Sequence, residues 1–214
     1  MIMFKIQRLS TSLSRLTSVE FSTYFNNMAK KSAAVIIAEG TEDMEFAVSV
    51  DVLRRAEIDV SIVSLENADS VKLKTGTKVV PDTVLKSIAG KCFDAVVLPG
   101  GPAYKALSKA PAVGDILKEQ EKSGRLIAAI CAAPIVLSTF DVGSGKKITC
   151  YPTCKDELNK DKYSFVNEIV AEDGNIITSQ GPGTAYDFAL AVVAKLLGKP
   201  TAKKVAEEML YKYV

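Results

Sequence analysis

The chain has 214 residues, of which 48% are hydrophobic and 24% charged, and its formal net charge is +2. This composition is typical of a soluble globular protein with one domain of ordinary size. No apolar run approaches the ~20 residues that cross a bilayer, so we expect no membrane span. The chain contains no histidine, which excludes Cys-His and Ser-His catalytic pairs and histidine-containing zinc sites.

Basic residues concentrate at the N-terminus. Residues 1–31 hold five lysines and arginines against one acid, Glu20, which gives this segment a net charge of +4. Its first half is rich in Ser and Thr, and apolar residues from Ile6 to Leu16 follow helical spacing. Two interpretations remain open: a mitochondrial transit peptide, or a disordered extension ahead of a compact protein that starts at Met28.

From residue 32 to residue 214, short apolar runs alternate with helical patterns. This alternation predicts one α/β domain with an open parallel sheet that is covered by helices on both faces. In chain order we expect a strand at 33–38, a helix at 42–56 with Thr41 as N-cap, a strand at 60–65, a hairpin at 71–74 and 78–80, a short helix at 84–88, a strand at 93–98, a helix at 112–122, a strand at 126–130, a hairpin at 165–171 and 175–178, and helices at 184–197 and 201–213.

Cys131 lies where a predicted strand meets a predicted helix. Residues 126–130 form an apolar run, and Pro134 is tolerated in the first turn of a helix. Ala129 and Ala133 are small enough for the tight turn of a nucleophile elbow. Because free N–H groups at a helix N-terminus stabilise a thiolate, we expect the pKa of Cys131 to lie below its ordinary value. The alternative is a small buried apolar residue without chemistry.

Two further groups are expected near Cys131. Ligands bind such sheets at the carboxyl ends of the strands. Gly100 and Gly101 follow one of these strands, and their N–H groups, with that of Ala132, can hold an oxyanion, although a simple tight turn explains the glycines equally well. On a helical wheel Glu45 faces inward, where burial raises the pKa of its carboxyl and lets it donate or move protons. Otherwise it is a helix-start carboxylate in water.

The remaining cysteines suggest little chemistry. Cys150 and Cys154 have C-x3-C spacing, but a tetrahedral metal site needs two more soft ligands. We therefore expect structural thiols there, and neither a metal nor another cofactor. Cys92 precedes a strand and is expected to be a partly buried filler. The N-terminus lacks the continuous apolar core of a secretory signal, so no disulfide framework is expected.

Four segments in this order carry a family resemblance: AEGTEDME (38–45), DAVVLPGG (94–101), LIAAICAAP (126–134) and ITSQGPGT (177–184). Together they resemble the Parkinsonism-associated protein deglycase family of the ThiJ/PfpI superfamily, in the form found in invertebrates. The resemblance extends from about residue 33 to near the C-terminus. It implies a flavodoxin-like fold, a homodimer, and a cysteine of low pKa that oxidises readily to sulfinic acid.

The resemblance also assigns roles to residues. Cys131 corresponds to the nucleophile, Glu45 to the carboxylic acid that hydrogen-bonds it, and Gly101 and Ala132 to the backbone donors. Tyr151 stands before a proline where the family usually has histidine, and we expect it to line the substrate site together with Gly100. A phenol titrates near ~10 and cannot act as a base at neutral pH as imidazole does.

Further departures concern the rim of the site. The loop after Gly101 is about one residue short, no basic residue stands at Thr75, and Gln180 replaces an arginine that is common in the family. These departures bear on substrate affinity and leave the sulfur site complete.

Two functions follow from the resemblance. The first is protection against oxidative stress as a cofactor-free glyoxalase or protein deglycase that acts on methylglyoxal or its early adducts with amines and thiols. The second is a non-enzymatic redox sensor or chaperone-like dimer that is switched by oxidation of Cys131. No nucleic-acid site is indicated. We expect a cytoplasmic or mitochondrial location, and the resemblance adds the nucleus.

Overall fold

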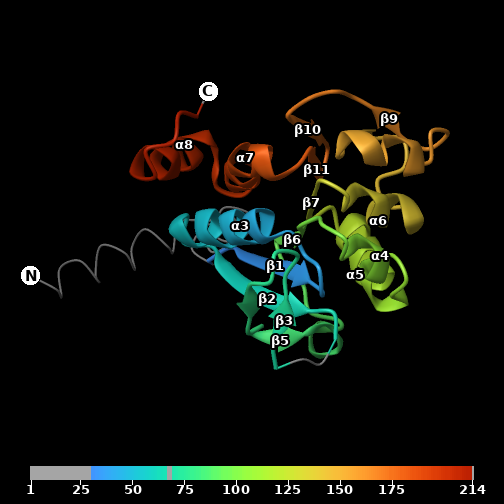
Figure 1. The fold of residues 1–214 in the computed structure, drawn as a ribbon. Coiled ribbons are helices and arrows are strands. Elements are labelled where there is room, and N and C mark those ends of the chain that lie inside the picture. Colours follow the sequence, from blue (N-terminus) through green and yellow to red (C-terminus); the bar gives the residue numbers. More distant parts are fainter. Residues whose placement is uncertain (1–29, 67–68, 214) are drawn as a thin grey trace, which may run out of the picture. The chain divides into compact units, whose positions relative to one another are not determined.

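The structure is a computed structural model that describes residues 30–66 and 69–213 (Figure 1). The expected N-terminal extension, residues 1–31, lies almost entirely outside these ranges. Its two interpretations and the domain boundary therefore stay predictions. None of the helices in the described ranges has both the length and the apolar character that crossing a bilayer requires.

The strands of the described chain form one large sheet and two small ones. The large sheet consists of β1 (Ser32–Ile37), β2 (Asp59–Ser64), β5 (Thr83–Val84), β6 (Ala95–Leu98), β7 (Leu126–Ile130), β10 (Val170–Asp173) and β11 (Ile176–Ser179). Their spatial order is β10-β11-β7-β6-β1-β2-β5. All neighbours pair in parallel except β10 and β11. The small sheets are β3 (Val71–Lys72) with β4 (Lys78–Val79), and β8 (Lys147–Ile148) with β9 (Ser164–Phe165).

Helices cover both faces of the large sheet. They are α3 (Asp43–Arg55), α4 (Tyr104–Leu107), α5 (Pro111–Lys122), α6 (Pro134–Thr139), α7 (Ala185–Leu197) and α8 (Lys199–Glu208), with 3-10 turns at Leu85–Ile88, Pro152–Glu157 and Pro182–Thr184. α3 packs against α7 and α7 against α8, whereas α5 packs on β6 and β7 (Figure 1). The unit β1-α3-β2 advances toward one edge of the large sheet, and the unit β6-α5-β7 advances toward the other edge. Because both crossovers are right-handed, α3 and α5 lie on opposite faces of the sheet.

The central strands are apolar because both of their faces are covered. Every residue of β6 and β7 is buried, and so is every residue of β1 after Ser32. A strand that is buried on both sides cannot alternate polar with apolar residues. The core therefore runs along the middle of the sheet.

The chain reverses direction across the sheet between β1 and β6. β1 leads through α3 to one side, and β6 leads through α5 to the other. The loops that follow two such strands diverge and leave a crevice at their carboxyl ends. The segments after β1, β6 and β7 all meet at this edge of the sheet.

Most of the predicted elements are confirmed, including the hairpin at β3 and β4, but several details are wrong. The first arm of the second hairpin begins at Val170 rather than at residue 165, because Phe165 belongs to β9 and pairs beside Ile148 of β8. This hairpin adds an antiparallel edge to the sheet. The last helix runs over Lys199–Glu208 and ends before the expected residue 213, and α4 was not predicted.

The N-cap of α3 is Glu42 and not Thr41. An Oε2 atom of Glu42 accepts the N–H of Glu45 at 2.9 Å. Thr41 is fully buried, and its hydroxyl exchanges two hydrogen bonds with the backbone of Ala38, at 2.8 and 3.0 Å. The threonine therefore closes the turn after β1 and leaves the capping of the helix to the next residue.

Candidate active site

Cys131 occupies a sharp bend directly after β7. Its φ of 64° lies in the left-handed region, which costs a residue with a side chain roughly 1 kcal/mol or more. Two backbone hydrogen bonds hold the bend: the Cys131 N–H donates to the carbonyl of Ser179 at 3.0 Å, and the Tyr151 N–H donates to the carbonyl of Cys131 at 2.8 Å. The predicted nucleophile elbow is thus present, and segments from two other parts of the chain hold it.

Glu45 lies beside Cys131 in the interior. Its side chain comes from the first turn of α3 and is fully buried, as the helical wheel predicted. Its Oε2 atom accepts the N–H of Gly100 at 2.6 Å. Its Oε1 atom is buried and makes no hydrogen bond to the described residues. A buried carboxyl with one free oxygen is placed to hold a proton for a neighbour.

The position of Gly100 explains how the two groups come so close. A methyl group built on Gly100 would lie 2.6 Å from Cβ of Cys131 and 2.9 Å from Oε2 of Glu45. Any side chain at this position would force the thiol and the carboxyl apart. The glycine therefore serves close approach and not only the tight turn that was its simpler interpretation.

Burial dominates the electrostatics of the pair. It raises the pKa of Glu45 from 4.5 to about 7, against the lowering effect of the Gly100 N–H. Burial, followed by the charge of Glu45, raises the pKa of Cys131 to about 12, although the backbone N–H groups of Gly101 and Ala132 act in the opposite direction. The prediction of a lowered thiol pKa is therefore wrong, because burial and the neighbouring carboxylate outweigh the helix terminus and the donors.

The two groups titrate as one unit. Above the raised pKa of Glu45, which is about 7, the pair has lost its first proton and one proton remains for the two groups. The proton can sit on the thiol beside a carboxylate, or on the carboxyl beside a thiolate, with the same total charge. The second form is the nucleophile, and the buried Oε1 atom of Glu45 is placed to stabilise it by donating a hydrogen bond.

One of the three expected backbone donors has another partner, because the N–H of Gly100 donates to Glu45 and is not free for an oxyanion. The N–H groups of Gly101 and Ala132 lower the pKa of the Cys131 thiol. Gly101 has a φ of 81°, and an added Cβ atom there would lie 2.5 Å from the carbonyl oxygen of Gly40. Only glycine fits this conformation and this contact, so the loop can bring its N–H to the sulfur.

Tyr151 contributes through its backbone and lies at the rim. Its side chain is 42% exposed, and its ring lies near Gly181, where an added Cβ atom would be 3.2 Å from the ring. The role of the phenol in substrate binding stays a prediction, as do the roles expected of the other candidate residues.

Two groups that the sequence analysis did not single out also shape the site. Glu42 is buried, and its carboxylate accepts the N–H of Glu45. Its own N–H donates to the carbonyl of Gly100 at 3.0 Å. Lys74 lowers the pKa of Glu45 through its charge. Glutamate is not among the residues favoured at an N-cap, whereas Thr41 beside it is, so no sequence signal pointed to Glu42. The approach of Lys74 depends on tertiary structure.

The other thiols lie apart from this chemistry. Cys150 and Cys154 are buried and free, and burial raises the pKa of Cys150 to about 12. Cys92 is exposed, so its expected burial is wrong. The residue precedes β6 at the amino edge of the sheet, where the loop emerges. In the described parts of the chain, no three Cys, Asp or Glu side chains gather as a metal would require.

Known proteins share this fold and sequence. Residues 31–195 match the DJ-1/PfpI family. Protein dj-1beta of Drosophila melanogaster is 48% identical over 86% of this chain and 98% of its own length, and its crystal structure superimposes with a TM-score of 0.84, covering 86% of this chain and all of that one. The glutathione-independent glyoxalase DJR-1.2 of Caenorhabditis elegans is 39% identical over 79% of this chain and 91% of its own length. This chain therefore belongs to the DJ-1/PfpI family.

Proposed function

We propose that the protein is a cofactor-free glyoxalase or deglycase that acts on methylglyoxal or on its early adducts with amines and thiols. The observation that carries the proposal is the close approach of Cys131 to the buried carboxyl of Glu45, around a glycine whose Cβ would touch both side chains. A relative of this chain is named a glutathione-independent glyoxalase, which supports the same chemistry. The chain has no histidine, so Glu45 is the candidate base.

The proposed reaction begins when the thiolate of Cys131 adds to the aldehyde carbon. The N–H groups of Gly101 and Ala132 stabilise the oxyanion of the resulting hemithioacetal. Glu45 takes the proton from this carbon and returns it to the neighbouring ketone carbon, so both electrons stay within the substrate. Water then hydrolyses the thioester and releases lactate and the free thiol. When the aldehyde arrives as an adduct, the C–N or C–S bond of the adduct breaks first and the repaired amine or thiol leaves with a proton. The aldehyde carbon then bonds to the Cys131 sulfur, and the remaining steps are the same.

The test compares lactate formation from methylglyoxal by the unmodified protein, Cys131→Ser and Glu45→Gln. We expect Cys131→Ser to form no lactate above background, and Glu45→Gln to lose at least ~100-fold in kcat, the usual contribution of general acid–base catalysis. Cys92→Ser is the matched control, because it removes an exposed thiol at the other edge of the sheet. Equal lactate formation by all four proteins would exclude the enzymatic function.

A redox sensor is the second candidate, and the same donors support it. Two peroxide molecules would each transfer one oxygen to the Cys131 sulfur and leave as water, which yields a sulfinate. The N–H groups of Gly101 and Ala132 and the protonated Oε1 of Glu45 are suited to bind its oxygens. Intact mass after mild peroxide treatment should show two added oxygens at Cys131. Oxidation spread evenly over all four cysteines would contradict this function.

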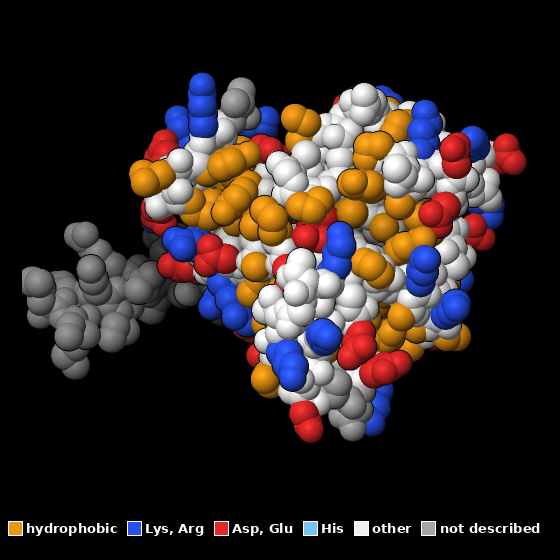
Figure 2. All heavy atoms as spheres, in the orientation of Figure 1, with side chains coloured by type: hydrophobic (Ala, Val, Ile, Leu, Met, Phe, Trp, Pro, Cys, Tyr) orange, Lys and Arg blue, Asp and Glu red, His pale blue; other side chains and the backbone are white. Residues whose placement is uncertain are grey.

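We also propose that the protein is a homodimer. Tyr186 on α7 is 39% exposed and Leu210, just beyond α8, is 96% exposed. Figure 2 shows hydrophobic side chains gathered over the region of α7 and α8, and such patches mark interaction surfaces. Light scattering should give twice the mass of one chain, and a monomeric mass at micromolar concentration would refute the proposal.

The proposed location is the cytoplasm or the mitochondrion, with the nucleus as a further compartment. The basic, Ser- and Thr-rich residues 1–31 support the mitochondrial alternative. N-terminal sequencing of the protein from isolated mitochondria would show removal of this segment, whereas an intact N-terminus would argue against a transit peptide.

A further inference from the structure

The first turn of α3 contains an altered form of a known helix cap. In a capping box, the side chain of the N-cap residue accepts the N–H of the residue three positions later, and the side chain of that later residue accepts the N–H of the N-cap. Here Glu42 accepts the N–H of Glu45 at 2.9 Å. The N–H of Glu42 donates instead to the carbonyl of Gly100 at 3.0 Å, and the carboxyl of Glu45 accepts the N–H of Gly100 at 2.6 Å. The two glutamates therefore hold Gly100 between them.

The next residue of this loop lies directly on the main chain of Glu42. A Cβ atom added to Gly101 would lie 2.6 Å from the backbone nitrogen of Glu42 and 3.2 Å from its Cα atom. The N–H of Gly101 is one of the donors that lower the pKa of the Cys131 thiol. The position of Glu42 therefore determines both the partner of the Glu45 carboxyl and a donor to the sulfur.

A glutamate is an unusual residue for this place. Ser, Thr, Asp and Asn are favoured at an N-cap. Glu42 is only 7% exposed, and no Lys or Arg side chain of the described residues forms an ion pair with its carboxylate. The buried carboxyl of Glu45 lies in the same turn, so two acids of like charge share a small buried space. A local arrangement that opposes folding in this way is typical of a functional site.

Two nearby charges act on Glu45 in opposite directions. Burial raises the pKa of Glu45 most, the charge of Glu42 raises it further, and the charge of Lys74 lowers it. The N–H of Lys74 donates to the carbonyl of Thr41 at 2.9 Å, which attaches the turn between β3 and β4 to the start of α3. The titratable groups on the elements that surround Glu42 are Asp43 and Glu45 of α3, Glu39 of the loop after β1, Lys72 and Lys74 of the hairpin, Tyr104 of α4, and Cys131 after β7.

We propose that Glu42 is a positioning residue for Cys131: it holds Glu45 and Gly100 in register, and its negative charge favours the form of the pair in which Glu45 carries the proton and Cys131 is the thiolate. The repulsion acts mainly on Glu45, because Glu42 adjoins it in the first turn of α3 and is connected to Cys131 only through Gly100 and Glu45. The proton moves from sulfur to carboxyl oxygen, and none enters or leaves the pair. The inference rests on the proposed function only for the use that catalysis makes of this thiolate.

The test measures the rate of alkylation of Cys131 by iodoacetamide from pH 5 to pH 9.5 in the full-length protein and in Glu42→Gln. Glutamine keeps an oxygen for the N–H of Glu45 and removes the charge. We expect equal rates at pH 5, a midpoint about half a pH unit lower and a plateau about threefold lower, because without the charge the proton stays more often on the sulfur. A merely structural role would lower the rate at every pH and leave the midpoint unchanged.

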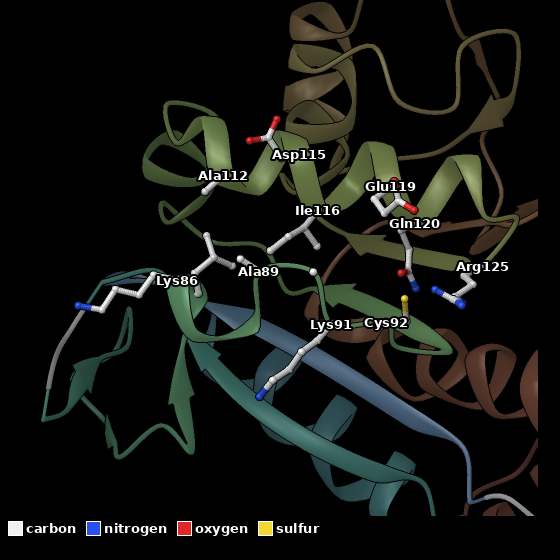
Figure 3. A pocket seen from close by; sticks show the side chains of 12 residues that line it. Lys86, Ala89, Lys91, Cys92, Ala112, Asp115, Ile116, Glu119, Gln120 and Arg125 are labelled. Carbon is white, nitrogen blue, oxygen red and sulfur yellow. The ribbon is translucent and has the colours of Figure 1, made fainter.

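Three single variants serve as controls. Glu42→Asp keeps the charge in a residue that is favoured at an N-cap, so its midpoint should equal that of the unmodified protein. Lys74→Gln removes the opposing charge and should raise both the midpoint and the plateau. Glu119→Gln is the matched control, because Glu119 is an exposed acid of α5 that lines a separate cavity of about 280 Å³ (Figure 3). It should change neither quantity.

A double variant shows whether Glu42 acts through Glu45. In the Glu45→Gln background, adding Glu42→Gln should change the alkylation rate by less than about twofold at each pH, because the charge then has no carboxyl to act on. A change as large as in the unmodified background would show that Glu42 acts on the sulfur directly, and would overturn the proposal.

Three other results would also overturn it: identical profiles for Glu42→Gln and the unmodified protein, a loss of rate that is equal at every pH, or shifts of the same sign in Glu42→Gln and Lys74→Gln. Lactate formation is measured separately. If the unmodified protein formed no lactate while the alkylation profiles shifted as expected, the enzymatic function would be excluded and the role of Glu42 would be confirmed.

Discussion

Replacing Glu45 with glutamine should make the stability of the protein less dependent on pH. Glutamine has nearly the shape of a protonated glutamate, so it can keep the hydrogen bond from Gly100 while it removes the ionisation. At pH 4.5, where the buried carboxyl is protonated, the variant and the unmodified protein should therefore have similar free energies of unfolding. At pH 8, where the buried carboxyl of the unmodified protein is ionised, the variant should be more stable.

The magnitude follows from the raised pKa. Between pH 4.5 and about 7, the unfolded chain releases the proton of Glu45 while the folded chain retains it. Because the folded state then binds more protons than the unfolded state, the free energy of unfolding falls as the pH rises through this range. Above about pH 7 the contribution of Glu45 no longer changes with pH. A pKa that moves from 4.5 to about 7 corresponds to a loss of about 3 kcal/mol.

The assay is urea unfolding at pH 4.5 and pH 8 for the unmodified protein, Glu45→Gln and the control Glu57→Gln. Glu57 is exposed beyond the far end of α3, so its replacement should have little effect at either pH. The difference in unfolding free energy between Glu45→Gln and the unmodified protein should grow by about 3 kcal/mol from pH 4.5 to pH 8. A difference that stays constant would show that Glu45 ionises in the folded protein as it does in the unfolded one.

Three further changes test the same site. Alkylation of Cys131 by iodoacetamide, mapped by mass spectrometry, should accelerate as the pH rises through about 7, where the pair loses its first proton. In Glu45→Gln the midpoint of this pH profile should move above the ordinary thiol value of ~8.5, because burial persists. Identical pH profiles for the two proteins would refute the shared proton. Gly100→Ala should destabilise the protein by ~1–3 kcal/mol in urea and suppress this alkylation, whereas Gly183→Ala, where an added Cβ atom meets nothing within 4 Å, should do neither. Thr41→Val should lower the free energy of unfolding by ~1–3 kcal/mol through the loss of its buried hydrogen bonds, and an unchanged thermal midpoint would contradict this.

The fold was largely predictable because each central strand can be detected from its own short stretch of sequence. β1, β6 and β7 are short apolar runs followed by glycine, proline or a tight turn, and their burial on both faces leaves a continuous hydrophobic pattern in the sequence. The inward orientation of Glu45 was predictable for the same reason, since helical periodicity alone separates it from the charged face of α3. The edge of the sheet was harder to predict, because the pairing of Phe165 in β9 depends on a distant partner.

The electrostatics of the site were not predictable from the chain. The sequence showed a thiol at a helix start, which lowers a pKa, but burial and the distance to Glu45 are properties of the folded state and act more strongly. The exposure of Cys92 was missed for a similar reason. Its neighbours in the sequence suggest the start of a buried strand, but the side chain is exposed and lines a pocket together with residues of α5 and with Arg125, which come from later in the chain.

The two hydrogen bonds that hold the bend at Cys131 link its reactivity to distant parts of the chain. Ser179 and Tyr151 belong to segments that follow the cysteine by 48 and 20 positions along the sequence. If either segment detaches on warming, the main chain at Cys131 is free to relax toward an ordinary conformation, and the thiol loses its alignment with the carboxyl. Because Tyr151 lies outside the large sheet, detachment of its segment can inactivate the protein before the sheet melts.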